Sequence, residues 1–311
     1  MTANAVVQLF SKGTKTSQQW QETTAQDQGS FFCSFEATIS TAEASLTLLG
    51  CHQKRTRSDI HAIETADGVE VIIQPLELYR LHQQPGLAVF DMDSTLIQQE
   101  VIDELARSVG RYDKVAAVTE AAMRGELDFE ASLRARVAEL KGVSTDIWDK
   151  LKAEVITFTP GARELVQFLR QRGWKTAVLS GGFKPLADWV KDTLGLDYAF
   201  ANQLAVDEAT GTLSGEVLSG TLVVGAALKK ELLLQLAIQN DIPIERTIAV
   251  GDGSNDLLMM GAAGLGIAFN AKPKVQEAAP VRLNTSTLLD IAYILGFSKQ
   301  GVNEILTTDD P

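Results

Sequence analysis

Four short apolar runs dominate the hydrophobic pattern of the second two thirds of the chain. They are rich in Val, Ile and Ala, and they lie at 87–90, 175–180, 247–251 and 265–269. Continuous apolar runs of this length are typical of strands that are buried on both faces of a parallel sheet. Segments with a helical polar and apolar pattern separate the runs, at Gly161–Arg172, Lys184–Leu194, Ala226–Gln239 and Asn255–Ala263. This alternation predicts an α/β fold with a doubly wound, Rossmann-like parallel sheet.

Two insertions interrupt the alternation. The first covers roughly 101–153, has no strand pattern, and predicts a small helical cap. The second covers 197–218 and alternates polar with apolar positions. Such alternation predicts a hairpin, and we place its turn near Ala209–Gly211.

The first 84 residues have a different texture, because they are rich in Gln, Thr and Ser and their periodic segments are short. The pattern predicts strands at 31–39 and 69–74 and a helix at Ala42–Leu49. Pro and Gly in 82–86 predict a linker. We therefore divide the chain into a small N-terminal α/β domain over 1–84 and a larger domain over 85–311 that carries the cap.

Composition narrows the possible partners. Asp and Glu number 40 against 28 for Lys and Arg, a formal net charge of -12. An acidic surface repels nucleic acid and anionic membranes, so we expect neither as a partner. No apolar run reaches the length that spans a membrane, and the N-terminus lacks the apolar core of a signal peptide. The only cysteines are Cys33 and Cys51, which suits a reducing cytoplasm.

Polar loops follow three of the apolar runs. Asp91 and Asp93 follow the first run, SGGF (180–183) follows the second, and GDGSND (251–256) follows the third. Ligands bind at the carboxyl ends of the strands in a doubly wound sheet, so we expect these loops to converge. Adjacent carboxylates need a cation, and Mg²⁺ prefers such ligands. A hydroxyl and bare amides before a helix favour an anion site.

Each of these features alone has an ordinary structural interpretation. Asp-x-Asp occurs often in surface turns, and a glycine turn can simply join a strand to a helix. Asn and Asp before a helix are common capping residues. Lys229, which opens the helical segment before the third run, would ordinarily be a solvated charge. The ordered set of three loops and a lysine is more specific than its parts.

That ordered set resembles the haloacid dehalogenase superfamily of hydrolases over roughly 87–295. The resemblance implies that Asp91 is a nucleophile and that Asp93 is a general acid and base. It implies a Mg²⁺ site whose ligands are Asp91, the backbone carbonyl of Asp93, and Asp252, with Asp256 nearby. It also implies phosphate-binding residues, which are Ser180, Gly181, Lys229 and Asn255.

A narrower resemblance, to the phosphoserine phosphatase family, is carried by 91–106, 122–137 and 268–273. It implies hydrolysis of O-phosphoserine through an aspartyl-phosphate, the last step of serine biosynthesis. Glu100 would meet the ammonium group of the substrate and Arg136 its carboxylate. Met123 and Phe129 would be apolar cap positions beside the substrate.

Alternative interpretations of these four residues remain. Glu100 could open a helix, where acidic residues interact favourably with the dipole. Arg136 could pair with an acid on its own helix, either Glu139 or Glu130. Met123 and Phe129 could be core residues of the cap.

Two other functions also remain open. The chain could be a phosphatase or phosphotransferase for another small phosphorylated metabolite, or a catalytically silent protein that senses a ligand. Relatives sometimes carry a regulatory or dimerising module of ferredoxin-like topology before the catalytic domain, which leaves a homodimer as an option for this chain.

Overall fold

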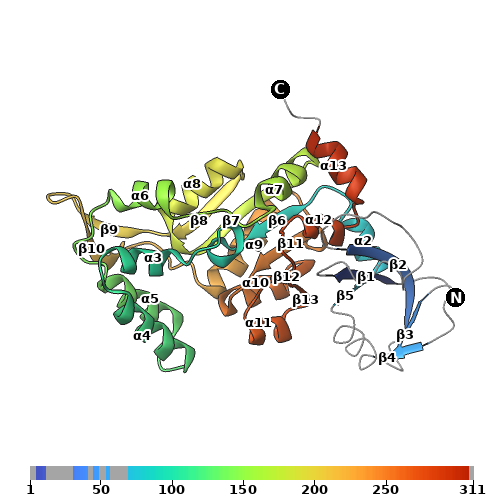
Figure 1. Cartoon of the computed structure of the whole chain (residues 1–311), viewed down its shortest axis with the longest axis horizontal. Coiled ribbons are helices and arrows are strands. Elements are labelled where there is room, and N and C mark those ends of the chain that lie inside the picture. The colour runs from blue at the N-terminus through green and yellow to red at the C-terminus, as the bar shows by residue number, and fades with distance from the viewer. Residues whose placement is uncertain (1–4, 12–30, 41–44, 49–53, 57–68, 308–311) are drawn as a thin grey trace.

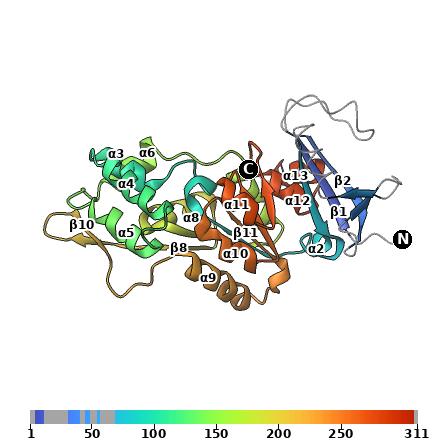
Figure 2. The ribbon, with the colours of Figure 1, turned by 90° about the horizontal axis from the view of Figure 1, so that it is seen from below.

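The structure is a computed structural model that describes residues 5–11, 31–40, 45–48, 54–56 and 69–307. A six-stranded sheet with helices on both faces occupies the middle of the molecule (Figure 1). The helical cap lies at one end of the longest axis, and a second, N-terminal sheet lies at the other end (Figures 1 and 2).

The central sheet is parallel throughout, with the strand order β13-β12-β11-β6-β7-β8. Its strands are β6 (Leu87–Phe90), β7 (Lys175–Phe183), β8 (Tyr198–Asn202), β11 (Thr247–Gly251), β12 (Leu265–Phe269) and β13 (Val281–Leu283). The four predicted apolar runs are therefore confirmed as strands. From β6 the chain first adds β7 and β8 on one side, and it then adds β11, β12 and β13 on the other side. The topological switch point therefore lies between β6 and β11.

Alternate residues of each strand face two separate cores. Ala88 and Phe90 point into a core with helices α7 (Ala162–Gln171), α8 (Lys184–Leu194) and α12 (Asp290–Ile294). Leu87 and Val89 point into the opposite core, whose helices are α9 (Ala226–Gln239), α10 (Leu257–Ala262) and α11 (Pro273–Ala278). Because both faces are covered, apolar residues occupy successive positions of β6, β11 and β12 rather than alternate ones. A last helix, α13 (Lys299–Thr307), packs near α7.

The cap consists of four helices between β6 and β7 and one hairpin. These elements are α3 (Val101–Ser108), α4 (Tyr112–Met123), α5 (Phe129–Ala138), α6 (Ile147–Glu154), β9 (Leu204–Asp207) and β10 (Thr212–Val217). Backbone hydrogen bonds between Leu213 and the segment at Gly142 and Val143 tie the hairpin to the helices.

The predicted hairpin over 197–218 is wrong in its first part. Only β9 and β10 form the hairpin, with its turn at 208–211, whereas β8 joins the central sheet parallel to β7. Alternation along a strand reports which positions are half-buried, but it does not report which neighbour supplies the hydrogen bonds.

The described part of the N-terminal segment is an antiparallel five-stranded sheet of order β4-β3-β2-β1-β5. Its strands are β1 (Ala5–Ser11), β2 (Phe31–Ser40), β3 (Ser45–Leu48), β4 (Lys54–Thr56) and β5 (Val69–Pro75), and the short helix α2 (Leu76–Leu81) follows them. The helix predicted at 42–49 is wrong at 45–48, which form β3; its other positions lie outside the described residues. Ser-Leu-Thr-Leu alternates, and Leu46 and Leu48 lie opposite residues of β2.

Two buried glutamines join this sheet to the central fold. Gln8 Nε2 donates to the carbonyl oxygen of Tyr293 at 2.8 Å, and Gln74 Nε2 donates to that of Ile294 at 2.9 Å. Both carbonyls belong to the last turn of α12, where helix carbonyls lack partners within the helix. The segment predicted as a linker is packed only at its ends: His82 is fully buried near Trp174 and Gly86 is buried, whereas residues 83–85 are exposed.

No helix among the described residues has the length and apolar character that crossing a membrane requires.

Candidate active site

Asp91 stands at the carboxyl end of β6, beside the switch point. Its backbone N–H donates to Val250 of β11 at 2.8 Å, so the sheet holds this residue in place. Its Oδ1 accepts from the Met92 N–H at 2.8 Å. The following turn is tight, and Ser94 has a left-handed φ of 56°. Backbone strain of this kind is often concentrated at functional sites.

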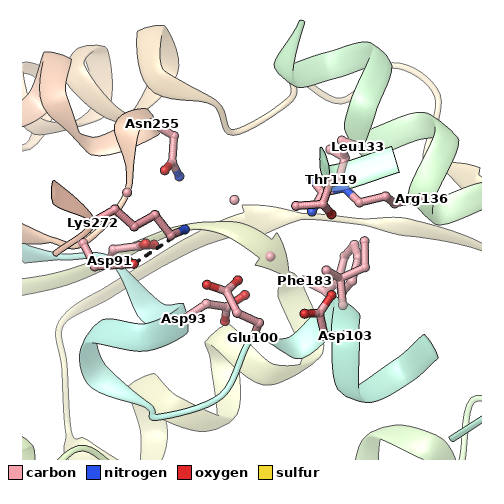
Figure 3. Close-up of a pocket in the computed structure, with 15 residues that line it drawn as sticks. Asp91, Asp93, Glu100, Asp103, Thr119, Leu133, Arg136, Phe183, Asn255 and Lys272 are labelled. Carbon is pink, nitrogen blue, oxygen red and sulfur yellow. Dashed lines mark ion pairs between the residues drawn. The ribbon is translucent and has the colours of Figure 1, made fainter. Parts of the chain in front are cut away.

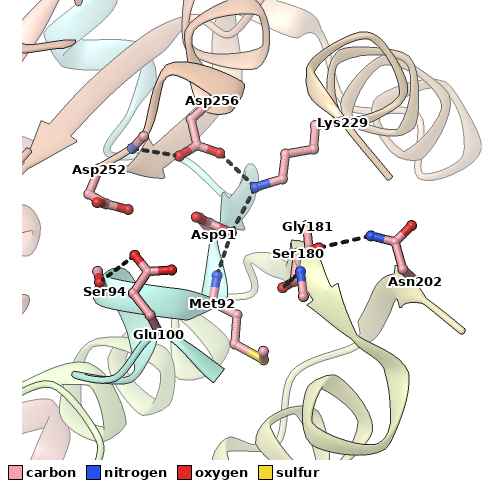
Figure 4. Close-up of polar contacts among 12 residues, drawn as sticks. Asp91, Met92, Ser94, Glu100, Ser180, Gly181, Asn202, Lys229, Asp252 and Asp256 are labelled. Atoms are coloured by element: carbon pink, nitrogen blue, oxygen red, sulfur yellow. Dashed lines mark hydrogen bonds and ion pairs between the residues drawn. The ribbon is translucent and has the colours of Figure 1, made fainter. Parts of the chain in front are cut away.

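Three buried carboxylates meet at the end of β6 and β11. Oxygens of Asp91, Asp252 and Asp256 all lie within 4.8 Å of one another. Lys229 Nζ donates to Asp91 Oδ1 and to Asp256 Oδ1, both at 2.7 Å (Figure 4). Burial alone would lower the pKa of Lys229, but Asp256 and Asp91 together raise it, so this lysine is a buried, permanent cation. The ordinary interpretation of Lys229 as a solvated charge does not hold.

The single positive charge of Lys229 does not neutralise the three carboxylates of this cluster. Burial, and then the charge of Asp91, raises the pKa of Asp252 to about 8. The nearest cation to Asp252 among the described residues is Lys272, whose Nζ lies 3.9 Å from Asp252 Oδ2. Hard oxygen donors with excess negative charge are the donor set of a hard divalent cation, so the residues fit the predicted metal site.

Asp93 lies beside the cluster with its carboxyl buried. Burial raises its pKa well above the ordinary value, and the charges of Glu100 and Asp91 raise it further. The close approach of Asp93 to the second strand end depends on a glycine: a Cβ on Gly182 would lie 3.1 Å from Asp93 Oδ2. Asp93 is therefore suited to carry a proton next to Asp91.

The SGGF segment, predicted as a loop, is the irregular carboxyl end of β7, where the pairing with β8 shifts register between Leu179 and Phe183. Hydrogen bonds within and around this strand end organise it. Ser180 Oγ accepts from the Gly182 N–H at 2.8 Å. Asn202 Nδ2 donates to the Gly181 carbonyl at 2.9 Å (Figure 4). Asn202 Oδ1 accepts from the Val224 N–H at 2.8 Å. The sequence did not single out Asn202, whose position in an edge strand carries no distinctive pattern. This buried amide links the strand end to the segment before α9.

A cavity of about 330 Å³ opens above these groups, between the central sheet and the cap (Figure 3). Its lining includes predicted site residues, which are Asp91, Asp93, Glu100, Arg136, Gly181, Asp252 and Asn255. Four predicted site residues do not line the cavity, which are Ser180, Lys229, Asp256 and Phe129. Lys229 nevertheless contacts the lining residue Asp91 by a hydrogen bond, and it contacts Asp256 by another. The side chain of Met123 lies outside the described residues.

Sequence reasoning missed several lining residues with polar side chains, which are Asp103, Thr119 and Lys272. Lys272 stands within 268–273, one of the segments that carry the family resemblance, so that motif could have led to it. Asp103 and Thr119 look like ordinary helix positions, and no pattern distinguishes them.

The cap contacts the loops of the core through Phe129. A Cβ on Gly181 would lie 3.1 Å from its ring, and one on Gly225 would lie 2.9 Å away. Two glycines, one at the carboxyl end of β7 and one just before α9, therefore allow this aromatic ring to lie close to the backbone of the core. Phe129 also packs against the main hydrophobic core, so its core interpretation and its place near the site are compatible.

Arg136 faces the cavity, and its alternative partners are engaged elsewhere. Glu130 pairs with Arg134 at 2.6 Å, and Glu139 pairs with Lys114 at 3.4 Å. Glu100 precedes α3 and accepts a hydrogen bond from Ser94 Oγ at 3.0 Å. The cavity thus holds the carboxylate cluster and Glu100 at one side and Arg136, which the cap supplies, at the other (Figure 3).

Comparisons with known proteins agree with this geometry. The model of the haloacid dehalogenase-like hydrolases matches residues 88–261. A phosphoserine phosphatase of Idiomarina loihiensis is 54% identical over 69% of this chain and 94% of its own length. One of Streptomyces coelicolor is 44% identical over 84% of this chain, and the match spans 62% of that relative's length. A solved structure, the phospho-aspartyl intermediate analogue of phosphoserine phosphatase, is 42% identical, with a TM-score of 0.61. It covers 68% of this chain and 98% of its own.

The chain therefore belongs to the haloacid dehalogenase-like hydrolases, enzymes built on this sheet with this arrangement of loops. Within that class, it belongs to the phosphoserine phosphatase family.

Proposed function

We propose that this chain hydrolyses O-phospho-L-serine to L-serine and phosphate through an aspartyl-phosphate on Asp91. The observation that carries the proposal is the cavity, in which the carboxylate of Asp91 shares about 330 Å³ with Glu100 and Arg136. One anion and one cation match the two charged ends of an amino acid. The relatives named above are phosphoserine phosphatases, and one is described with a phospho-aspartyl intermediate analogue.

The reaction proceeds in two displacements at phosphorus. In the first, a carboxylate oxygen of Asp91 bonds to phosphorus, the bond from phosphorus to the serine oxygen breaks, and Asp93 gives its proton to that oxygen. In the second, water attacks the phosphoryl group while Asp93 takes a proton from it, and the bond to Asp91 breaks. Phosphate leaves and Asp91 is free again.

Several groups are proposed to bind the phosphoryl oxygens during both displacements. Ser180 and the Gly181 amide would act from the carboxyl end of β7, and Lys229 and Asn255 from the opposite side. Preorganised donors of this kind stabilise charge without reorganising during the reaction. Because Lys229 is already held by Asp91 and Asp256, its position is set before substrate arrives.

We propose Mg²⁺ as the cation of the carboxylate cluster. Asp91, Asp252, Asp256 and the backbone carbonyl of Asp93 would hold it. Bound there, it would neutralise charge on the phosphoryl oxygens and on the carboxylates that surround them.

Removal of divalent metal should silence the protein. We expect no phosphate release after chelation by EDTA, full recovery with Mg²⁺, and poor recovery with Ca²⁺, which is larger and takes more ligands. The measurement is phosphate release from phosphoserine at a fixed free-metal concentration. Full activity after exhaustive chelation would contradict the proposed cofactor.

Substrate preference tests the role of Arg136. Replacement by Ala should cost phosphoserine about 2–4 kcal/mol of transition-state binding, because a charged partner is lost in a partly desolvated site. Phosphoethanolamine lacks the carboxylate, so it should be a poor substrate and lose little further. The measurement is the ratio of kcat/KM for the two substrates before and after the substitution.

Arg134→Ala is the matched control. It removes the same charge from the same helix, but Arg134 is paired with Glu130 at the surface. We expect the substrate ratio to be unchanged in this variant. If Arg136→Ala behaves like the control, Arg136 does not bind the carboxylate. If the wild type does not prefer phosphoserine, the substrate is another small phosphorylated metabolite.

Three further statements belong to the proposal. We propose a cytoplasmic location, a domain division near residue 84, and a homodimer in which the N-terminal sheet takes part. Their support is the composition of the chain and the contrast between the antiparallel N-terminal sheet and the parallel central sheet. Sedimentation of the full chain and of residues 85–311 would test the last two together.

A further inference from the structure

Arg136 is only weakly fixed by direct contacts. Its Nε donates to the Ser132 carbonyl at 3.3 Å, a long bond within its own helix. Among the described residues, no carboxylate oxygen lies within 4.0 Å of its guanidinium nitrogens. Burial lowers the pKa of Arg136, and the charges of Glu100, Asp103 and Asp93 act in the opposite direction. A partly buried cation of this kind needs an anion to stabilise it and to set its direction.

Two of the three acids near Arg136 have other tasks. Asp93 lies beside the carboxylate cluster, against the carboxyl end of β7, and the proposed reaction uses it as the proton carrier. Glu100 accepts the hydrogen bond of Ser94 Oγ at 3.0 Å, which directs it toward the turn after β6. Asp103 is the third, and within the described part of the chain its carboxylate accepts no hydrogen bond.

Asp103 stands where it can act on the guanidinium. It lies in the first turn of α3 and lines the cavity, and Figure 3 shows it on the opposite side of that cavity from Arg136 on α5. A guanidinium offers five N–H donors in a planar fork. One side of the fork can therefore be held by a carboxylate of the protein while another side is presented to a carboxylate of the substrate.

We propose that Asp103 is a positioning residue that orients the Arg136 guanidinium for the carboxylate of the substrate. This inference rests on the proposed function, because it concerns the same site. Asp103 acts through Arg136 and does not touch the phosphoryl group or the ammonium. Its effect is thus confined to substrates that carry a carboxylate.

The ordinary role of an acid at this position is interaction with the helix dipole, which favours acidic residues in a first turn. Glu104 shares that role, because it follows Asp103 in the same turn of α3. It lies 3.7 Å from Arg107 and is not part of the cavity lining. Glu104→Gln therefore removes the same charge from the same helix turn as Asp103→Asn, but it loses the contact with Arg107 and leaves the cavity unchanged.

The experiment measures kcat/KM for phosphoserine and for phosphoethanolamine in both variants, each made in the wild type and in Arg136→Ala. We expect Asp103→Asn to lower the value for phosphoserine about tenfold, mainly through KM, the usual scale for one charged interaction. Phosphoethanolamine should change by less than about twofold, as should both substrates in Glu104→Gln. In the Arg136→Ala background, Asp103→Asn should have no further effect, since the residues act as a unit.

Three outcomes would overturn the inference. An equal loss for both substrates would mean that Asp103 acts on the ammonium or on the fold. A lowered melting temperature with an unchanged substrate ratio would assign it to the helix dipole alone. A full additional loss in Arg136→Ala would show that it does not act through Arg136. Failure of the proposed function is distinct, because the wild type itself would then show no preference for phosphoserine.

Discussion

Asp91→Asn should reduce steady-state phosphate release by about 10⁴-fold or more while the fold remains intact. The amide is nearly the same shape as the carboxylate, but it is not an anionic nucleophile, and loss of the whole covalent route has effects of this size. The side-chain oxygen of Asn can still accept from the Met92 N–H, which holds the loop. Lys229 keeps its partner Asp256, so the substitution does not leave a buried cation alone.

The measurement is phosphate release with phosphoserine, together with mass spectrometry of acid-quenched enzyme for a phosphoryl adduct. Wild type should show the adduct and Asp91→Asn should not. The preparation must be checked for deamidation, which would regenerate aspartate. Near-wild-type activity in a verified Asn preparation would eliminate the covalent mechanism.

Asp93→Asn should give a slow enzyme whose rate depends steeply on the leaving group. Proton transfer by a positioned acid contributes about 10²–10⁴-fold, so phosphoserine should lose activity on that scale. An aryl phosphate has a good leaving group and needs little protonation, so its loss should be much smaller. Asn resembles the neutral acid form that burial favours at this position, and we expect the variant to remain folded.

The comparison of p-nitrophenyl phosphate with phosphoserine provides the check, with both substrates assayed on the same preparation. Equal losses for the two substrates would argue against Asp93 as the acid. A loss in Asp93→Asn as deep as that in Asp91→Asn for the aryl substrate would point to a role in metal binding as the main one.

The strands of the central sheet could be predicted because the signal for each one, a short apolar run, lies within the strand itself. β6, β11 and β12 end where the apolar runs end, and helices α8 and α9 match their predicted ranges. A strand covered on both faces must be apolar at successive positions, and the sequence displays this requirement directly. The division near residue 84 remains a prediction.

Errors arose where pairing between distant segments decides the outcome. β8 was predicted as part of a hairpin, yet it pairs with β7 in the central sheet. The segment at 45–48 was predicted as helix, yet it pairs with β2. For β8 the strand itself was predicted and only its partner was wrong, whereas 45–48 tolerate either state and pairing with β2 selects the strand.

The sequence alone determined that carboxylates gather at one edge of the sheet, because Asp91, Asp93 and Asp252 lie at or just after the ends of buried strands, and parallel strands bring their carboxyl ends to one edge. Only the tertiary structure decided that Lys229 is buried between two carboxylates and that Asp103 faces Arg136 across a cavity. Burial and direction of a helical side chain depend on which element packs against that face. Helical spacing does not encode this, since a charge in a first turn looks the same whether it faces solvent or substrate.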